Sequence, residues 1–312
     1  MLTTGRATPS IPTIQTAVRD RGRSLFSCAN AVGVLRLVRH NRPVPEKLDG
    51  GRSDAGEPII TPDSVVGYTA ARAQLSVAEL GVAPVVIAVW GQRLFDGLSA
   101  RLSAAPLRHW WYGPRTPHVA GIAGEQPVSL VLLPVGAPGT VMIMEELIAA
   151  GAKAFLGMGL AGSLQQYLGP GAVVLAQAAM RDEGTSGHYA GLAEEARADK
   201  TLSAIVGAAL ADAGIATAAG RVWTTDAPYR ELRETVARLR QAGVLAVDME
   251  TSAMYVLGAH REIAVANLLL ISDVLSDPWL PAFHDDRLAE AMETAQDAMV
   301  QAASNALSHG RR

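Results

Sequence analysis

Three carboxylates, Asp248, Glu250 and Asp273, each lie at or near the end of an apolar stretch of the chain. Asp248 and Glu250 come directly after an apolar run and would lie on one face of an extended chain. Asp273 follows an almost wholly apolar stretch that ends in Ser272. A buried carboxylate costs on the order of a few kcal/mol unless it is hydrogen-bonded, so we expect these side chains to bind hydroxyl groups or to transfer protons.

The segment Gly157–Gly162 reads G-x-G-x-x-G and comes directly after the apolar residues Ala154–Leu156. A dinucleotide-binding loop has this spacing, but it follows the first strand of its domain and opens a helix. Here the segment lies in the middle of the chain, and Gly169–Gly171 favours a turn over a helix. Dinucleotide binding is therefore the weaker interpretation. The glycines either let a ligand approach exposed backbone amides or only form a tight turn.

Two polar segments, Met180–Tyr189 and Trp223–Glu231, each follow a predicted apolar strand. Loops at strand ends are where sheets covered by helices bind ligands. Arg181 either takes part in such a site or forms a structural ion pair with the neighbouring acids. Tyr229 offers a flat aromatic face that could stack on a base.

Bulk properties exclude several classes of protein. The 312 residues carry a net charge of −3, which predicts no binding to nucleic acid or to an anionic membrane. One cysteine, Cys28, rules out an intrachain disulfide, and the seven scattered histidines indicate no metal site. No apolar run reaches the roughly 18 to 20 residues of a membrane span. We therefore expect a cytoplasmic protein that needs no cofactor and binds a small molecule.

From Ile59 onward, apolar runs of strand length alternate with helical patterns, which predicts an α/β fold. The predicted strands are Pro84–Trp90, Ser129–Pro134, Ala154–Met158, Ala172–Gln177, Ala218–Thr224 and Ala264–Ser272. The predicted helices are Ser64–Leu80, Leu94–Leu102, Gly139–Ala150, Lys200–Ala213, Tyr229–Ala242, Thr251–Arg261 and Arg287–Ser308.

The amino-terminal part differs in composition from the rest. Residues 1–55 are rich in arginine and end in the polar, glycine-rich stretch Gly50–Gly56. This composition predicts a basic, flexible extension at residues 1–55 and a single catalytic domain at residues 56–312.

Five motifs in order along the chain resemble the nucleoside phosphorylase family, which includes purine nucleoside phosphorylase, uridine phosphorylase and the methylthioadenosine/adenosylhomocysteine nucleosidases. They are Gly159–Leu164, Arg181–Ser186, Trp223–Tyr229, Asp248–Glu250 and Ser272–Asp273. The resemblance implies a three-layer αβα domain with a central mixed, barrel-like sheet. It also implies a homo-oligomer, a dimer or a hexamer.

The resemblance also implies roles for residues. Glu250 would hold the ribose 2′ and 3′ hydroxyls, with Met249 packed on the sugar and Asp248 beside them. Asp273, next to Ser272, would donate a proton to N7 of a purine as the glycosidic bond breaks, which neutralises the leaving base. The candidates for binding the base are Tyr229, Asp226, Gly162 and Ala161.

The sequence departs from this family where phosphate binds. Phosphorolytic members have an arginine and a serine or threonine at the positions of Gly157 and Leu160. Without these two side chains, the site lacks the charge-assisted hydrogen bonds that would orient the phosphate dianion. The remaining candidates for holding phosphate or another nucleophile are Gly159, Arg93, Arg181 and Arg115.

Three interpretations of function follow. The first is phosphorolysis of a nucleoside, with a purine favoured and inorganic phosphate as co-substrate. The second is hydrolysis, although the nucleosidases activate water with an amino-terminal glutamate and Trp90–Arg93 contains no acid. The third is a nucleoside-binding protein without catalysis, against which Asp248, Glu250 and Asp273 argue.

Overall fold

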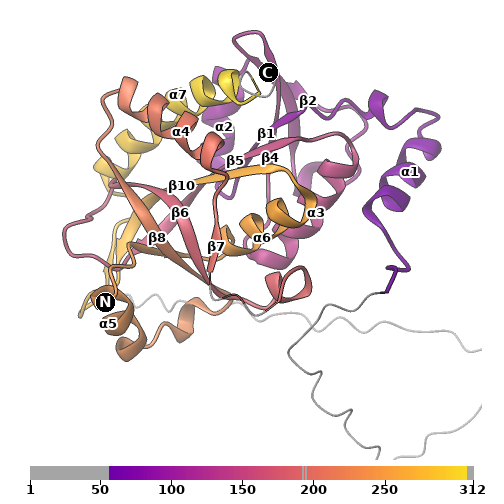
Figure 1. Ribbon diagram of the computed structural model, residues 1–312. Coiled ribbons are helices and arrows are strands. Elements are labelled where there is room, and N and C mark those ends of the chain that lie inside the picture. The colour runs from indigo at the N-terminus through magenta and orange to yellow at the C-terminus, as the bar shows by residue number, and fades with distance from the viewer. Residues whose placement is uncertain (1–55, 192, 194, 308–312) are drawn as a thin grey trace, which may run out of the picture. The chain divides into compact units, whose positions relative to one another are not determined.

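The computed structural model describes residues 56–191, 193 and 195–307, which are coloured in Figure 1. The basic extension predicted for residues 1–55 lies outside the described residues. No helix in the described part of the chain is long and apolar enough to cross a membrane.

Local signals explain where the helices begin. Thr61 caps α1 (Pro62–Arg72) through a reciprocal pair of hydrogen bonds with Ser64, and Pro62 occupies the first helical turn. Asp199 caps the helix that follows it by accepting from the amide of Leu202 at 2.7 Å. The other helices are α2 (Gln92–Arg101), α3 (Ala137–Ala149), α4 (Lys200–Asp212), α5 (Arg233–Gln241), α6 (Thr251–Arg261) and α7 (Asp286–Asn305). Short 3₁₀ turns lie at Ala78–Leu80, Gly113–Arg115, Ser186–His188 and Pro228–Arg230.

One mixed sheet of eleven strands runs through the domain. Its strands are β1 (Val85–Val89), β2 (Ala105–Pro106), β3 (His118–Ala123), β4 (Gln126–Leu132), β5 (Ala154–Ser163), β6 (Val173–Asp182), β7 (Glu195–Arg197), β8 (Thr217–Thr225), β9 (Ala246–Asp248), β10 (Ala264–Val274) and β11 (Leu280–Pro281). The order β10-β6-β8-β9-β5 closes on itself because β5 also pairs with β10 in parallel. The sheet is thus a five-stranded barrel extended on one side by β1, β4, β3 and β2.

Helices cover both faces of this sheet (Figure 1). One hydrophobic cluster joins α2, α4 and α7 to the strands through residues such as Leu98, Val206 and Met299. A second cluster joins α3 and α6 to the opposite face through residues such as Met144 and Tyr255. The prediction of a three-layer αβα domain with a mixed, barrel-like sheet is confirmed.

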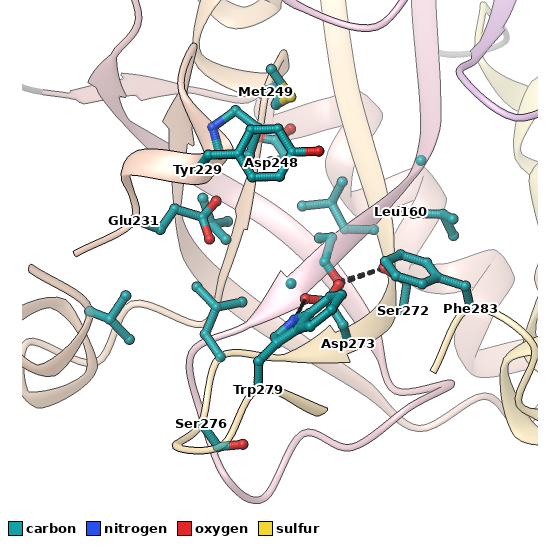
Figure 2. Close-up of a pocket in the computed structure, with 18 of the residues that line it drawn as sticks. Leu160, Tyr229, Glu231, Asp248, Met249, Ser272, Asp273, Ser276, Trp279 and Phe283 are labelled. Atoms are coloured by element: carbon teal, nitrogen blue, oxygen red, sulfur yellow. Dashed lines mark hydrogen bonds between the residues drawn. The ribbon is translucent and has the colours of Figure 1, made fainter. Parts of the chain in front are cut away.

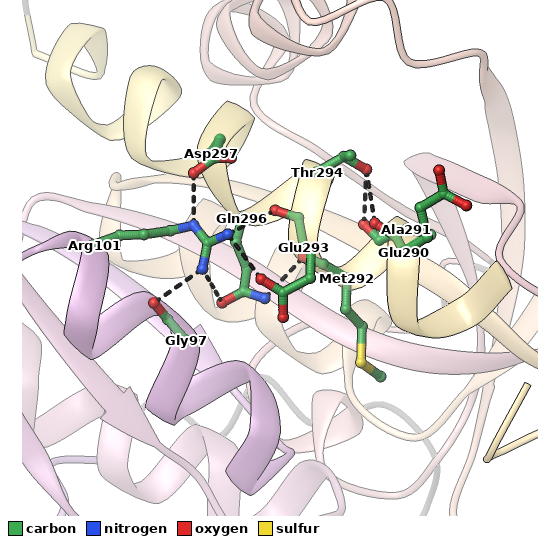
Figure 3. A network of polar contacts seen from close by, with 9 residues as sticks. All are labelled: Gly97, Arg101, Glu290, Ala291, Met292, Glu293, Thr294, Gln296 and Asp297. Carbon is green, nitrogen blue, oxygen red and sulfur yellow. Dashed lines mark hydrogen bonds and ion pairs between the residues drawn. The ribbon is translucent and has the colours of Figure 1, made fainter. Parts of the chain in front are cut away.

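A cluster of ion pairs at the protein surface connects α2 to α7 (Figure 3). Arg101, near the end of α2, donates to Asp297 at 2.6 Å and to Glu293 at 3.0 Å, both on α7. The same guanidinium also donates to the backbone oxygen of Gly97 at 3.2 Å. Because α2 and α7 are far apart in the sequence, this cluster fixes their relative position from outside the core.

Two predicted strands end too early. Ala154–Met158 continues to Ser163, so the glycine-rich segment is part of β5 and is not a loop. Likewise, β6 continues to Asp182 and includes Arg181. Glycines and polar residues weaken the apolar signal of a strand, but pairing with neighbouring strands on both sides outweighs that weakness. Strands β2, β3, β7, β9 and β11 were not predicted.

Two predicted helices begin or end elsewhere. Ser64–Leu80 stops at Arg72 and is followed by a separate 3₁₀ turn, at which Glu79 accepts from the amide of Ser76 at 2.7 Å. Tyr229–Ala242 begins only at Arg233, because Pro228 opens a 3₁₀ turn before it. In both cases a local side-chain or proline signal interrupts a longer helical pattern.

Candidate active site

A cavity of about 870 Å³ lies at the ends of β5, β9 and β10 (Figure 2). The segment before α5 and the segment after β10 complete its lining. Most of the predicted site residues line it: Gly159, Ala161, Gly162, Tyr229, Asp248, Met249, Glu250, Ser272 and Asp273. The predicted residues Arg93, Arg115, Arg181 and Asp226 do not line it. The motifs Gly159–Leu164, Trp223–Tyr229, Asp248–Glu250 and Ser272–Asp273 thus each contribute to the lining of one cavity, whereas Arg181–Ser186 does not.

Ser272 and Asp273 enter the cavity at a bulge of β10. Ile271 pairs with Ala161 and Asp273 pairs with Gly162, so Ser272 is an extra residue in this strand. A bulge changes the direction of the strand's side chains, and such irregularities are common beside active sites.

Both carboxylate oxygens of Asp273 accept hydrogen bonds, and its side chain is almost completely buried. The hydroxyl of Ser272 donates to one oxygen at 2.9 Å, and the indole Nε1 of Trp279 donates to the other at 2.8 Å (Figure 2). These two donors fix the plane of the carboxyl group. Hydrogen bonds from two donors also stabilise a negative charge on this carboxyl group.

Glu250 is the residue directly before α6, and it is 6% exposed. One oxygen accepts from the backbone amide of Gly136 at 2.6 Å, and the other accepts from the amide of Met249 at 3.2 Å. Burial, followed by the charge of Asp248, raises the pKa of Glu250 to about 8. A carboxylate held in this way near the cavity can accept hydrogen bonds from sugar hydroxyls.

Asp248 is held by protein groups on both of its oxygens. It accepts from the hydroxyl of Thr224 at 2.7 Å, from the amide of Thr251 at 2.9 Å and from the hydroxyl of Thr251. Burial raises the pKa of Asp248 against the opposing effect of these bonds. The observed role of its carboxylate is to join β8, β9 and α6, and this places Met249 and Glu250 at the cavity.

The glycines of β5 make room for side chains. A Cβ on Gly157 would collide with the amide of Asn267, and one on Gly162 would collide with Leu275. A Cβ on Gly159 would lie 3.1 Å from the ring of Trp90. These glycines are therefore explained by close packing inside the barrel, and not by a turn.

Next to Gly159, the cavity is lined by an apolar wall formed by Trp90, Val135 and Leu160. Leu160 is 36% exposed and lies near Phe283 in Figure 2. The indole nitrogen of Trp90 is occupied, because it donates to Thr140 at 2.9 Å. The apolar wall thus offers no side-chain donor to an anion.

The predicted arginines have other surroundings. Arg93, at the start of α2, and Arg115, in a 3₁₀ turn, are exposed. Arg181 donates to the hydroxyl of Ser186 at 2.8 Å and to the backbone oxygens of Gly191 and Ala193 at 2.7 and 3.0 Å. Its guanidinium therefore organises the loop after β6.

Asp226 joins the same group of loops. It accepts from the backbone amide of Gly184 at 2.8 Å and is exposed. Nearby, Glu183 accepts from the hydroxyl of Ser252 at 2.9 Å and so links this loop to α6. The role in binding the base that was predicted for Asp226 stays a prediction.

The sequence reasoning missed Glu231, Trp279 and Phe283, which also line the cavity. Burial, and then the charge of Asp273, raises the pKa of Glu231 to about 7. Glu231 lies just past the Trp223–Tyr229 motif, and the aromatic residues follow Ser272–Asp273 closely. The signal that could have revealed Trp279 and Phe283 is that large aromatic residues follow so soon after a motif predicted to be catalytic.

Two arginines line the cavity, and both have partners. Arg240 donates to the backbone oxygens of Leu164 and Leu275, each at 2.6 Å. Arg233 forms an ion pair with Asp277. Among residues 56–307, apart from the two positions left undescribed, no cluster of His, Cys, Asp and Glu side chains could hold a metal ion.

Comparison with known proteins identifies the family. The sequence profile described as the phosphorylase superfamily matches residues 85–307, and the chain belongs to this superfamily. The resemblance to nucleoside phosphorylases that the motifs indicated is thereby confirmed, and so is the assignment to a family of enzymes.

Two curated relatives carry different nucleoside names. Uridine phosphorylase of Treponema pallidum is 33% identical over 162 residues, which are 48% of this chain and 63% of that enzyme. The matched part is thus less than two thirds of that relative. Guanosine phosphorylase of Halorubrum lacusprofundi is 28% identical over 175 residues, which are 55% of this chain and 72% of that enzyme.

Solved structures share the fold. Purine nucleoside phosphorylase from Toxoplasma gondii in complex with immucillin-H has a TM-score of 0.68 at 22% identity and covers 74% of this chain and 94% of its own. Uridine phosphorylase from Vibrio fischeri has a TM-score of 0.64 at 24% identity and covers 72% of this chain and 93% of its own.

Proposed function

We propose that the protein cleaves the N-glycosidic bond of a purine nucleoside and transfers the pentosyl group to inorganic phosphate, giving free base and a pentose 1-phosphate. The observation that carries this proposal is that Glu250 and Asp273, two buried carboxylates on different elements, face one cavity. Relatives named as uridine, guanosine and purine nucleoside phosphorylases support it.

The proposed chemistry follows from these two groups. Glu250 accepts hydrogen bonds from the ribose hydroxyls and holds the sugar, with Met249 packed on it. As the bond between C1′ and the base nitrogen breaks, its electrons move into the base and positive charge develops on the sugar. Asp273 in its protonated form gives its proton to N7, and a phosphate oxygen forms the new bond to C1′.

A purine fits this arrangement better than a pyrimidine. N7 is a ring nitrogen that only purines present, and it takes up the negative charge of the departing base when it is protonated. The donors Ser272 and Trp279 stabilise the Asp273 carboxylate that this transfer leaves behind. Tyr229 borders the cavity and offers a face for stacking.

Hydrolysis is the second candidate, and one observation favours it. The apolar wall of Trp90, Val135 and Leu160 supplies no anion ligand, whereas a water molecule needs no cation. For phosphorolysis, a guanidinium must come from Arg93, from Arg181 after its loop rearranges, or from Arg115 of a neighbouring subunit in a homo-oligomer. Gly159 would then offer only backbone groups. We propose a cytoplasmic location and no cofactor for either reaction.

The test is the release of free base from purine and pyrimidine nucleosides, with and without inorganic phosphate, and identification of the sugar product. Strict dependence on phosphate, with pentose 1-phosphate formed from purine nucleosides, is the expected result. Release of free pentose without phosphate would replace phosphorolysis by hydrolysis. If no nucleoside in the panel is cleaved under either condition, the proposed function is wrong.

A further inference from the structure

Asn267 is the one polar residue in the apolar run 264–271 of β10. Its side chain is 1% exposed and does not line the cavity, so it can act on a bound ligand only through other residues. The amide nitrogen donates to the hydroxyl of Thr251 at 2.6 Å, while the amide oxygen has no hydrogen-bond partner among the described residues. A buried amide that is only half satisfied costs stability, so stability alone does not explain why this position is polar.

Asn267 lies at the junction between β10 and α6. Its side chain contacts Thr251 in the first turn of the helix, and its backbone amide donates to the hydroxyl of Tyr255 at 3.1 Å one turn later. The neighbouring strand makes room for the amide, because Asn267 pairs with Gly157 and a Cβ at Gly157 would lie 2.3 Å from the amide oxygen. Asn267 therefore ties β10 to the first two turns of α6.

The contact with Asn267 sets the direction of the Thr251 hydroxyl. A hydroxyl has one hydrogen, and the oxygen of Thr251 accepts from Asn267, so the hydrogen is left to donate to Asp248. Thr224 is arranged in the same way, because its oxygen accepts from the amide of Ser252 at 3.0 Å and its hydrogen goes to Asp248. Both hydroxyls thus act as donors to Asp248, which favours the ionised form of this carboxylate.

Asp248 in turn holds the segment that bears Glu250. It accepts from the backbone amide of Thr251 at 2.9 Å, and Glu250 is the residue between them at the start of α6. Glu250 also accepts from the amide of Gly136 at 2.6 Å. A hydrogen-bond chain from Asn267 through Thr251 to Asp248 therefore ends next to the carboxylate that lines the cavity.

We propose that Asn267 is a positioning residue that, by holding Thr251 against Asp248, orients the Glu250 carboxylate toward the 2′ and 3′ hydroxyls of a bound ribose. This inference rests on the proposed function in taking a nucleoside as the ligand and Glu250 as its contact with the ribose. Because β10 also carries Asp273, the contact between Asn267 and α6 sets the spacing between the two acids.

The experiment measures two probes with the full chain. One is a C-nucleoside analogue of inosine, which is not cleaved because a carbon atom replaces the base nitrogen bonded to C1′. The other is the same heterocycle without the sugar. Calorimetry gives the affinity of each, and the ratio of the first affinity to the second reports the contribution of the ribose.

Asn267→Val removes the amide donor with a residue that suits a strand. It is expected to lower the affinity ratio by about fivefold, the scale of one hydrogen bond. Asn267→Ser leaves room in the core and is too short to replace the contact with Thr251, so it should give the same result even if the valine variant does not fold. An unchanged ratio in Asn267→Ser would overturn the inference.

Val265→Ala is the matched control for loosened packing. Val265 is also buried in β10 and packs on α6 at Gly258, but it has no part in the hydrogen-bond chain. This variant should lower the free energy of unfolding and leave the affinity ratio as it is in the parent protein. An equal fall of the ratio in Val265→Ala would overturn the inference, because loosening of α6 would then be sufficient.

A double-mutant cycle tests whether Asn267 acts through Glu250. Glu250→Ala should lower the affinity ratio by itself, and adding Asn267→Ser should then cause little further fall, because the group that Asn267 positions is already gone. A further fall as large as that caused by Asn267→Ser alone would overturn the inference.

Cleavage of purine nucleosides by the parent protein is followed separately. A protein that cleaves none of them, but whose affinity ratio depends on both Glu250 and Asn267, would refute the proposed function and leave this inference standing. Cleavage by a protein whose ratio does not respond to Asn267→Ser would do the reverse. A ratio unchanged in Glu250→Ala would contradict the two together.

Discussion

Two sets of side chains line the same cavity and differ in what they offer a ligand. The carboxylate set of Glu231, Glu250 and Asp273 provides acceptors and a proton donor, whereas the apolar wall of Trp90, Val135 and Leu160 provides no charge. The resemblance of the motifs to the nucleoside phosphorylases implies a hydroxyl at the position of Leu160. The cavity thus offers hydrogen-bonding groups for the sugar and base of the proposed substrate, but its apolar wall offers no side-chain donor to an attacking anion.

The largest expected effect comes from removing the proposed acid of the carboxylate set. Asp273→Asn keeps the shape but cannot donate the same proton, so turnover of a purine nucleoside should fall by roughly 100-fold or more. Steady-state kinetics of base release measures this, with Asp277→Asn as a control that changes a nearby carboxylate paired with Arg233. Turnover near that of the parent protein would remove Asp273 from the mechanism.

Above about pH 8, where Glu250 is ionised, Glu250→Gln is expected to lower kcat/KM by about tenfold or more, because it weakens charged hydrogen bonds to the ribose. The pKa of Glu250 is raised to about 8, so the group is mostly neutral at pH 7 and ionises as the pH rises. Nucleoside affinity should therefore increase up to about pH 8 and then level off. Measuring nucleoside affinity in a Glu231→Gln background removes the contribution of Glu231, whose pKa is also raised, to about 7.

In that experiment, Glu262→Gln at the exposed carboxyl-terminal end of α6 is the matched control. An affinity that does not change with pH when Glu250 is intact would contradict ribose binding through its ionised form.

The apolar wall can be given the hydroxyl that the resemblance implies for phosphorolytic members of the family. Leu160→Ser adds a donor beside Gly159 and should lower the KM for phosphate by about fivefold, the scale of one added hydrogen bond. Leu160→Ala removes similar bulk without a hydroxyl and separates the two effects. Equal phosphate dependence in both variants would mean that the nucleophile does not contact this wall.

Trp279→Phe tests how much the hydrogen bond from Trp279 to Asp273 contributes to turnover. The substitution removes the indole donor to the Asp273 carboxylate but keeps an aromatic ring, so kcat should fall by only about threefold to tenfold. Phe283→Leu alters a neighbouring aromatic residue that donates no hydrogen bond to Asp273, so it should lower kcat by less than Trp279→Phe does.

The smallest effect on activity is expected far from the cavity. Arg101→Ala breaks the surface cluster between α2 and α7 and should lower the free energy of unfolding by about 1 kcal/mol. Urea denaturation measures the loss, and kcat should be unchanged. A large fall in activity would show that the position of α2 affects the catalytic site.

Much of the fold could be predicted because its signals are local. Continuous apolar runs predicted the central strands, such as Ala264–Ser272. The prediction failed where strands contain glycine, as in β5, or are very short, as in β9. In those places pairing with distant strands decides the structure. The hydrophobic periodicity of the sequence does not reveal such pairing.

The sequence by itself determined the α/β class, the family and the carboxylates Asp248, Glu250 and Asp273, because these follow from residue types in short stretches of chain. Only the tertiary structure decided that Asp248 is held by Thr224 and Thr251, that Arg181 binds its own loop, and that Glu231 and Trp279 meet Asp273 at one cavity. The contact of Asp248 with Thr224 and the meeting of Glu231 with Asp273 join segments that are distant in the sequence, and closure of the barrel brings them together. The contacts of Thr251, Arg181 and Trp279 are local, but they depend on the path of the turns and strand ends, which residue types alone do not specify.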